Sequence, residues 1–295
     1  MQDFPQKPIH LMTFEPGGSV DLVARLIAQG ISGPLGQPVT VENRPGIDSV
    51  EFVAQAPPDG YTLLHFGPQL WTAPLLRKVA YDPEQDLSPI TMAIVQPNVL
   101  VVHPSVAANS VEELIELARA RPGELKYASG INAASSQLAG ELFNYMAGVK
   151  LVGIPYKNTA QLAVSDLIAG KVQLMIFGAS SAMRHVKAGK LKALAITSAE
   201  RSALFPGLPT VAATLPGYES VHDEGVYAPA QTPVPIIKRL NQEIVRFLKT
   251  AEAKERLSSA GMEAVCSTPE QLAAKGKADM ARWGKVIKDA GIKAN

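Results

Sequence analysis

Near the start of the chain, apolar positions change their spacing in blocks, and each block predicts one element of secondary structure. A buried strand is predicted at 8–14 and an alternating strand at 38–42. Between them, apolar residues recur at helical spacing from 20 to 31. A short helix at 50–56 and a strand at 61–66 follow. This strand–helix–strand–helix–strand order predicts a parallel sheet with right-handed crossovers.

A second set of alternating elements begins near residue 100, and the last part of the chain is almost entirely helical. Ser110 and Glu113 have the spacing of a capping box, and Thr268 followed by Pro269 is a typical helix start. Strands are expected at 98–103, 127–130, 152–156, 172–177, 193–197 and 226–228, and helices at 134–147, 159–169, 180–188, 234–249, 251–260 and 269–290.

Helical segments need an apolar sheet face to cover, so the helical tail is expected to return to the first sheet. The chain is therefore predicted to be an α/β protein with two lobes, each a mostly parallel sheet flanked by helices. Residues 1–101 and 224–295 form the first, discontinuous lobe of this prediction, and residues 102–223 form the second.

Composition narrows the function classes. The 295 residues are 46% hydrophobic and carry a net charge of +1, with basic residues scattered rather than striped. This balance predicts neither a nucleic-acid partner nor attraction to an anionic membrane. One cysteine, Cys266, rules out an intrachain disulfide, and no apolar run is long enough for a membrane span. The bare start resembles a mature, processed exported protein; a cytosolic protein remains the alternative.

The first candidate site is the turn from Phe14 to Asp21, which joins the end of a strand to the start of a helix. Ligands of open α/β sheets bind at this edge. Gly17 and Gly18 allow a sharp turn, and the unpaired amides of the first helical turn suit a carboxylate. Ser19 is expected to cap the helix or to donate to a ligand. A tight capped turn without a ligand is the alternative.

The second candidate site is the loop 129–136, again between a strand end and a helix start. It offers a second set of amide and hydroxyl donors, and an ordinary capped helix is the alternative. Phe14, Phe66 and Phe177 lie at strand ends, where a ring either walls a pocket or closes the core.

The third candidate is the tripeptide His222-Asp223-Glu224, which invites a metal hypothesis. Consecutive residues seldom reach one ion, and no second ligand cluster accompanies them. A position near the predicted crossing between the lobes is favoured instead, where any of the three residues could touch a ligand. Catalytic motifs such as G-x-S-x-G and H-E-x-x-H are missing from the sequence. An enzyme using Glu15, Asp21 or His222 is the rival hypothesis, and a sensory or scaffold protein is a third.

Eight blocks of the sequence, taken in order, resemble the Bug family of periplasmic solute-binding proteins, which serve tripartite tricarboxylate transporters. The blocks are Phe14–Asp21, Gly36–Val39, Glu42–Gly46, Pro57–Leu64, Ile154–Lys157, Gly189–Ala195, Leu208–Val211 and Ala228–Pro233. The second loop departs from the family pattern, with Ile131 and Ala133 where glycines are usual. Larger side chains there predict a changed approach of a ligand to the backbone.

The resemblance implies a two-lobe Venus-flytrap fold, export with loss of a signal peptide, and a carboxylate held partly through backbone amides and water. Its ligand-binding residues would be Phe14, Gly18, Ser19, Ser129, Asn132, Ala133 and Ala134. Phe66, Gly67, Phe177 and Asp223 are further candidate contacts, chosen from their positions in the sequence and not from the resemblance. It also implies a periplasmic monomer that is no enzyme and needs neither cofactor nor metal. Its partners would be a mono- or dicarboxylate, an aromatic acid or an amino acid, and a membrane transporter or a sensor.

Overall fold

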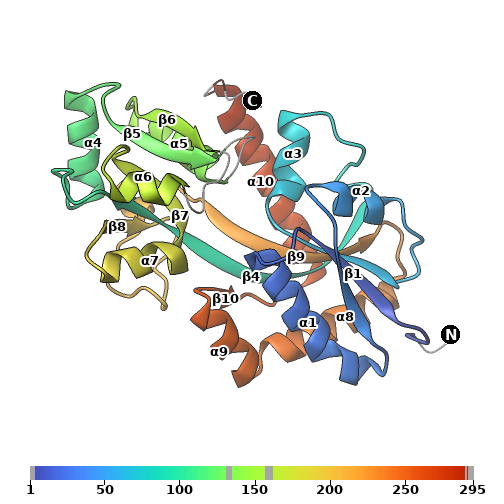
Figure 1. Cartoon of the computed structure of the whole chain (residues 1–295). Helices are drawn as coiled ribbons and strands as arrows, with labels where there is room; N and C mark the ends of the chain where they lie inside the picture. Colours follow the sequence, from blue (N-terminus) through green and yellow to red (C-terminus); the bar gives the residue numbers. More distant parts are fainter. Residues whose placement is uncertain (1–3, 131–134, 157–161, 290, 292–295) are drawn as a thin grey trace. The chain divides into compact units, whose positions relative to one another are not determined.

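The computed structural model describes residues 4–130, 135–156, 162–289 and 291. The chain divides into two compact units (Figure 1). Unit 1 comprises Met1–Val95 and Asp223–Gly284, and unit 2 comprises Gln96–His222 and Lys285–Asn295. Three elements continue through the divisions: β4 (Leu87–Val102), β9 (Val221–Pro229) and α10 (Pro269–Asp289).

Unit 1 is built on a sheet with the strand order β2-β1-β3-β9-β4, and β10 pairs with β4. β1 lies parallel to both of its neighbours, whereas β9 runs antiparallel to β3. The predicted order of strands and helices at the start of the chain is therefore confirmed. Besides β4 and β9, the strands of this sheet are β1 (Ile9–Thr13), β2 (Val39–Asn43), β3 (Thr62–Phe66) and β10 (Glu263–Ala264).

Helices cover both faces of this sheet because successive side chains of each strand point to opposite sides. On one face, Leu11 and Leu63 pack with α1 and α8, which lie side by side in Figure 1. On the other, Met12 and Leu64 pack with residues of α2, α3 and α10. The helices of unit 1 besides α10 are α1 (Ser19–Leu35), α2 (Asp48–Ala54), α3 (Gln69–Leu76), α8 (Val234–Leu248) and α9 (Ala251–Ser259).

Unit 2 has the strand order β4-β7-β5-β6, with β8 on the other side of β4. β5 is parallel to β6 and β7, and β4 is antiparallel to β7 and β8. The predicted α/β architecture is thus present in both units, with antiparallel pairings of β4 and β9 beside the parallel strands. The elements are β5 (Lys126–Gly130), β6 (Val152–Tyr156), β7 (Leu174–Gly178), β8 (Lys192–Ile196), α4 (Val111–Ala120), α5 (Ser135–Ala147), α6 (Val164–Ile168), α7 (Ala179–Lys187) and the 3₁₀ turn η2 (Val211–Ala213).

Two predicted helix starts are confirmed in atomic detail. At α4, the Ser110 hydroxyl accepts a hydrogen bond from the Glu113 amide at 3.2 Å, and the Glu113 carboxylate accepts one from the Asn109 amide at 2.7 Å. At α10, the Thr268 hydroxyl accepts from the Gln271 amide and the Gln271 side chain accepts from the Thr268 amide. Reciprocal bonds of this kind satisfy amides that a helix start leaves without partners.

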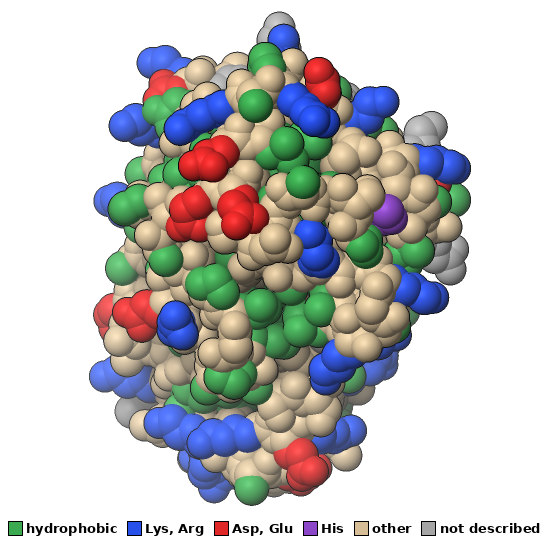
Figure 2. Space-filling view, turned by 90° about the vertical axis from the view of Figure 1, so that its left-hand side faces the viewer, with side chains coloured by type: hydrophobic (Ala, Val, Ile, Leu, Met, Phe, Trp, Pro, Cys, Tyr) green, Lys and Arg blue, Asp and Glu red, His purple; other side chains and the backbone are tan. Residues whose placement is uncertain are grey.

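Two of the predictions drawn from composition concern the helices and the surface charge. None of the helices within the described ranges is long and apolar enough to cross a membrane. On the face drawn in Figure 2, Lys and Arg side chains are dispersed among acidic and neutral ones rather than gathered in one stripe.

Two glycines of α10 predict opposite effects of the same substitution. A Cβ at Gly276 would lie 2.3 Å from the ring of buried Trp71, whereas a Cβ at Gly284 would meet only Leu75 at 3.8 Å. Alanine favours a helix over glycine by about 1 kcal/mol. We expect Gly284→Ala to stabilise the protein by up to about that amount, and Gly276→Ala to destabilise it by about 1–3 kcal/mol through overpacking. Urea unfolding of both variants measures the difference, and equal stabilisation would contradict the packing argument.

Candidate functional site

The turn between β1 and α1 presents unpaired backbone amides. Gly18 occupies the N-cap position of α1 with φ −90° and ψ −178°, and no side chain caps the helix. The first helical hydrogen bond runs from the Leu22 amide to the Gly18 carbonyl. Within the part of the chain that the structure describes, the amides of Ser19, Val20 and Asp21 have no acceptor. Because a helix start also carries partial positive charge, this turn suits an anion.

Ser19 is therefore the first helical residue and not the cap, which corrects one of the two roles expected for it. The other role, donation to a ligand, stays a prediction. Gly17 and Gly18 are exposed and Ser19 is half-buried, so the amides lie at an accessible position. Gly17 has φ +89°, a conformation that a residue with a Cβ seldom adopts.

The side chains of Asp21, Arg25 and Asn43 form a closed hydrogen-bonded ring that holds this turn in place. Asp21 accepts hydrogen bonds from the Gly17 amide at 3.1 Å, from Arg25 and from Asn43. Asn43, the last residue of β2, donates to the Phe14 carbonyl at 2.6 Å and accepts from Arg25 at 2.9 Å. Burial opposes ionisation of Asp21, but these donors and the Arg25 charge outweigh it and lower the Asp21 pKa. Asp21 is thus an anion at neutral pH.

Aromatic rings close the same edge of the unit 1 sheet. Phe14 is half-buried and meets Phe66 edge to face, with ring centroids 5.8 Å apart. Phe66 itself is only 2% exposed and belongs to the core, and the adjacent Gly67 is buried. Of the two rings, only Phe14 is exposed enough to contact a ligand, and it packs against the buried ring of Phe66.

The second candidate loop is described only at its two ends. Ser129 is buried and its hydroxyl donates to the Ile154 carbonyl at 3.4 Å. The Gly130 amide donates to Ser136 at 2.9 Å. Asn132, Ala133 and Ala134, all predicted contacts, lie outside the described residues. Phe177, at the end of β7, is half-buried against the unit 2 core.

Asp223 belongs to a charged cluster that the sequence pattern does not reveal. Lys275 of α10 lies 3.5 Å from the Asp223 carboxylate and also pairs with Asp279, which in turn pairs with Arg282 at 3.0 Å. Burial raises the pKa of Asp279; the attraction of Lys275 opposes this, and the Asp223 charge reinforces it. No group of three or more potential metal ligands occurs among the described residues.

The raised pKa of Asp279 predicts a gain of stability on Asp279→Asn. Because its folded-state pKa lies above the unfolded value, ionisation of this carboxyl destabilises the native state at every pH above both values. We expect the asparagine variant to be the more stable at neutral pH, with the difference vanishing as pH falls below about 4, the ordinary aspartate value. Thermal unfolding against pH measures this.

Asp166 supplies a control of opposite sign for that measurement. A hydrogen bond from Lys171 is the main cause that lowers the Asp166 pKa. Asp166→Asn is therefore expected to lower stability at neutral pH, with the loss fading as pH falls through the folded pKa. A destabilised Asp279→Asn variant at neutral pH would show that the ion pairs outweigh burial.

A buried histidine and a buried carboxylate lie next to each other in the unit 1 sheet. His65 Nε2 is 3.4 Å from the Glu224 carboxylate, and both side chains are fully buried. Thr13, also fully buried, donates its hydroxyl to the His65 carbonyl at 3.1 Å. Of these three residues, Thr13 is the last of β1 and leads into the candidate turn. No local spacing pattern predicts this pair, because β3 and β9 are distant along the chain.

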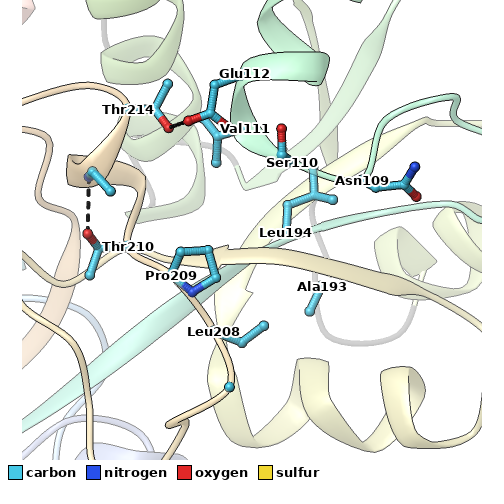
Figure 3. Close-up of a pocket in the computed structure, with 12 residues that line it drawn as sticks. Asn109, Ser110, Val111, Glu112, Ala193, Leu194, Leu208, Pro209, Thr210 and Thr214 are labelled. Carbon is cyan, nitrogen blue, oxygen red and sulfur yellow. Dashed lines mark hydrogen bonds between the residues drawn. The ribbon is translucent and has the colours of Figure 1, made fainter.

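A cavity of about 240 Å³ lies within unit 2, between the start of α4, β8 and the segment 207–214 (Figure 3). Val111, Leu194 and Leu208 supply apolar walls, and a hydrogen bond from Thr214 to Glu112 joins two sides of the rim. None of the predicted ligand-binding residues lines it.

The α/β fold is that of the periplasmic solute-binding proteins, as solved structures of this class show. The sequence model of the tripartite tricarboxylate transporter family receptors, TctC, matches residues 23–292. The chain belongs to this family. The Bug resemblance, the fold class and the solute-binding function predicted from the sequence are thereby confirmed.

Similar proteins support the same assignment. BugT of Bordetella pertussis is 35% identical over 298 residues, covering 98% of this chain and 91% of BugT. The structure of R. palustris Rpa4515 with adipate matches with a TM-score of 0.82 and 35% identity over 99% of both chains. MatC from Rhodopseudomonas palustris with bound malate matches with a TM-score of 0.78 and 29% identity, covering 96% of this chain and 100% of MatC.

Proposed function

We propose that this chain is a periplasmic receptor that captures a small carboxylate and delivers it to a membrane transporter or a sensor without altering it chemically. The observation that carries the proposal is the start of α1, where the Ser19, Val20 and Asp21 amides have no acceptor within the described ranges. Two structurally similar receptors hold dicarboxylates, adipate and malate. A carboxylate oxygen is the kind of acceptor that such amides bind.

In unit 1, Phe14, Gly18 and Ser19 are the proposed contacts with the ligand. Phe66, which meets Phe14 edge to face, its neighbour Gly67, and Asp223, which lies 3.5 Å from Lys275, are further proposed contacts. The buried Ser129 and half-buried Phe177 are the proposed contacts of the described part of unit 2, to which we add Asn132, Ala133 and Ala134. Capture would proceed by closure of the predicted lobes, with bending near 100–102 and 222–226. The receptor acts as a monomer in this proposal.

The rival enzyme hypothesis needs a free general base, and Asp21 is poorly suited to that role. Its carboxylate already accepts from Gly17, Arg25 and Asn43, and its pKa is lowered. General bases work best with a pKa near the operating pH. Glu15 is exposed to solvent, as expected for a solvated charge.

A thermal-shift titration with adipate and malate tests the proposal, since a ligand that binds only the folded state raises the unfolding temperature. Adipamide, which replaces both carboxylates with neutral amides, is the matched control and is expected to give no shift. Mass spectrometry after long incubation is expected to return adipate and malate intact. Turnover of either acid would favour the enzyme, and the lack of a shift with any carboxylic acid would refute carboxylate capture.

Two substitutions test the proposed contacts. Gly18→Trp, which adds bulk at the exposed N-cap, and Ser129→Ala, which removes a hydroxyl, are each expected to weaken binding while the protein stays folded. Circular dichroism checks the fold and calorimetric titration measures affinity. Unchanged affinity in both variants would remove the two loops from the site.

A further inference from the structure

The ring formed by Asp21, Arg25 and Asn43 holds the candidate turn at both ends. Asn43 donates to the Phe14 carbonyl, where β1 ends, and Asp21 accepts from the Gly17 amide, one residue before the N-cap of α1. The three side chains also bond to one another, at distances of 2.8–3.1 Å. The turn is thus fastened by side chains from α1 and from the end of β2.

The ring also places a negative charge next to the proposed anion site. Asp21 is a residue of the first turn of α1, and its side chain is 9% exposed. A carboxylate bound at the α1 amides would lie close to this second carboxylate, and like charges at short range repel. Asp21 in isolation would therefore oppose the binding that the turn is shaped for.

Arg25 compensates the negative charge of Asp21 through a bidentate contact with its carboxylate. Its Nε lies 3.1 Å from one Asp21 oxygen and its Nη2 lies 2.9 Å from the other. Paired donors of this kind hold a carboxylate in a fixed orientation. The Arg25 side chain is 53% exposed, so its positive charge lies at the surface while its guanidinium group pairs with Asp21.

We propose that Arg25 is a positioning residue for ligand binding: it acts through Asp21, neutralising the carboxylate that shapes the turn so that the α1 amides can donate to an anion. This rests on the proposed function. It assigns two separable roles, with Asp21 and Asn43 setting the shape of the turn and Arg25 setting its charge balance.

A charge role and a purely structural role predict different double-mutant results. Arg25→Gln leaves Asp21 charged and uncompensated, and we expect adipate and malate to bind on the order of tenfold more weakly, less so at high salt. Asp21→Asn removes the repelling charge and is expected to bind both acids at least as tightly as the wild type. The double variant is expected to return to within about threefold of the wild type, because it removes both charges.

Calorimetric titration of adipate and malate at low and high salt measures these affinities, and thermal unfolding verifies that each variant is folded. Arg25→Lys keeps the positive charge but lacks the bidentate guanidinium group, and it is expected to bind nearly as tightly as the wild type. This variant tests the charge role if Arg25→Gln fails to fold. Arg246→Gln is the matched control: it removes a similarly exposed arginine that pairs with a buried carboxylate on α8. Its affinity is expected to be unchanged.

A double variant weaker than either single variant, or an Arg25→Lys variant as weak as Arg25→Gln, would overturn the charge role. A wild-type protein that binds neither acid, nor any other carboxylate, would overturn the proposed function together with this inference. A wild type that binds while Arg25→Gln binds equally well would overturn this inference alone.

Discussion

Replacing Glu224 with leucine is expected to lower the free energy of unfolding by about 1–3 kcal/mol, the usual cost of removing one partner of a buried polar group. Glu224 and His65 are both fully buried and 3.4 Å apart. The single substitution removes one partner of the pair while the other stays in a site of low dielectric. Urea unfolding, with the slope m compared between variants, measures the loss.

The double variant His65→Leu/Glu224→Leu distinguishes the interaction between the two side chains from the cost of burying them. Replacing both members of a buried ion pair with apolar residues of similar volume is often neutral or stabilising. We therefore expect the double variant to be more stable than either single variant, with a coupling free energy of opposite sign to the single losses. Additive losses would show that His65 and Glu224 do not act as a pair.

Local patterns predicted most of the elements because each strand and helix buries one face. The helix at 20–31, for example, is visible from apolar spacing alone, and α1 buries that stripe against the unit 1 core. The capping boxes at Ser110 and Thr268 are equally local, since their bonds join residues three positions apart. Short-range chemistry therefore predicted both where these helices lie and where they begin.

The long strand β4 shows what local patterns miss. The pattern indicated a strand only at 98–103, whereas β4 runs from Leu87 to Val102 and serves both sheets. Pro89 and Pro97 lie inside it, and proline normally argues against a strand interior. Likewise β9 begins at Val221, ahead of the predicted 226–228. Partners distant in the sequence, such as β3 and β7, stabilise these strands.

The candidate turn was predictable from the sequence, but its supporting contacts were not. A strand followed by two glycines and a helix start is a local signal for an anion site. Asn43 reaches this turn only because β2 lies beside β1, with Asn43 in register with Thr13. Asn43 belongs to one of the sequence blocks that resemble the Bug family, but its hydrogen bonds follow from the sheet register.

Replacing Ser19 with proline is expected to weaken adipate and malate binding by about ten- to a hundredfold while leaving the fold intact. Ser19 is the first residue of α1, a position where proline fits because its missing N–H has no helical partner. Gly18, at φ −90° and ψ −178°, already has the extended backbone that precedes proline. The substitution therefore removes one amide donor from the proposed site, and a hydrogen bond to a charged acceptor contributes about 1.5–3 kcal/mol.

Two controls isolate the amide from other effects. Ser19→Ala removes the hydroxyl and keeps the amide, so its loss of affinity is expected to be smaller than that of Ser19→Pro. Ala251→Pro introduces proline at the first position of α9, after an N-cap residue with φ −65° and ψ 154°, and is expected to leave affinity unchanged. Calorimetry measures the affinities and thermal unfolding checks the fold. If Ser19→Pro binds both acids as tightly as Ser19→Ala, the Ser19 amide does not hold the ligand.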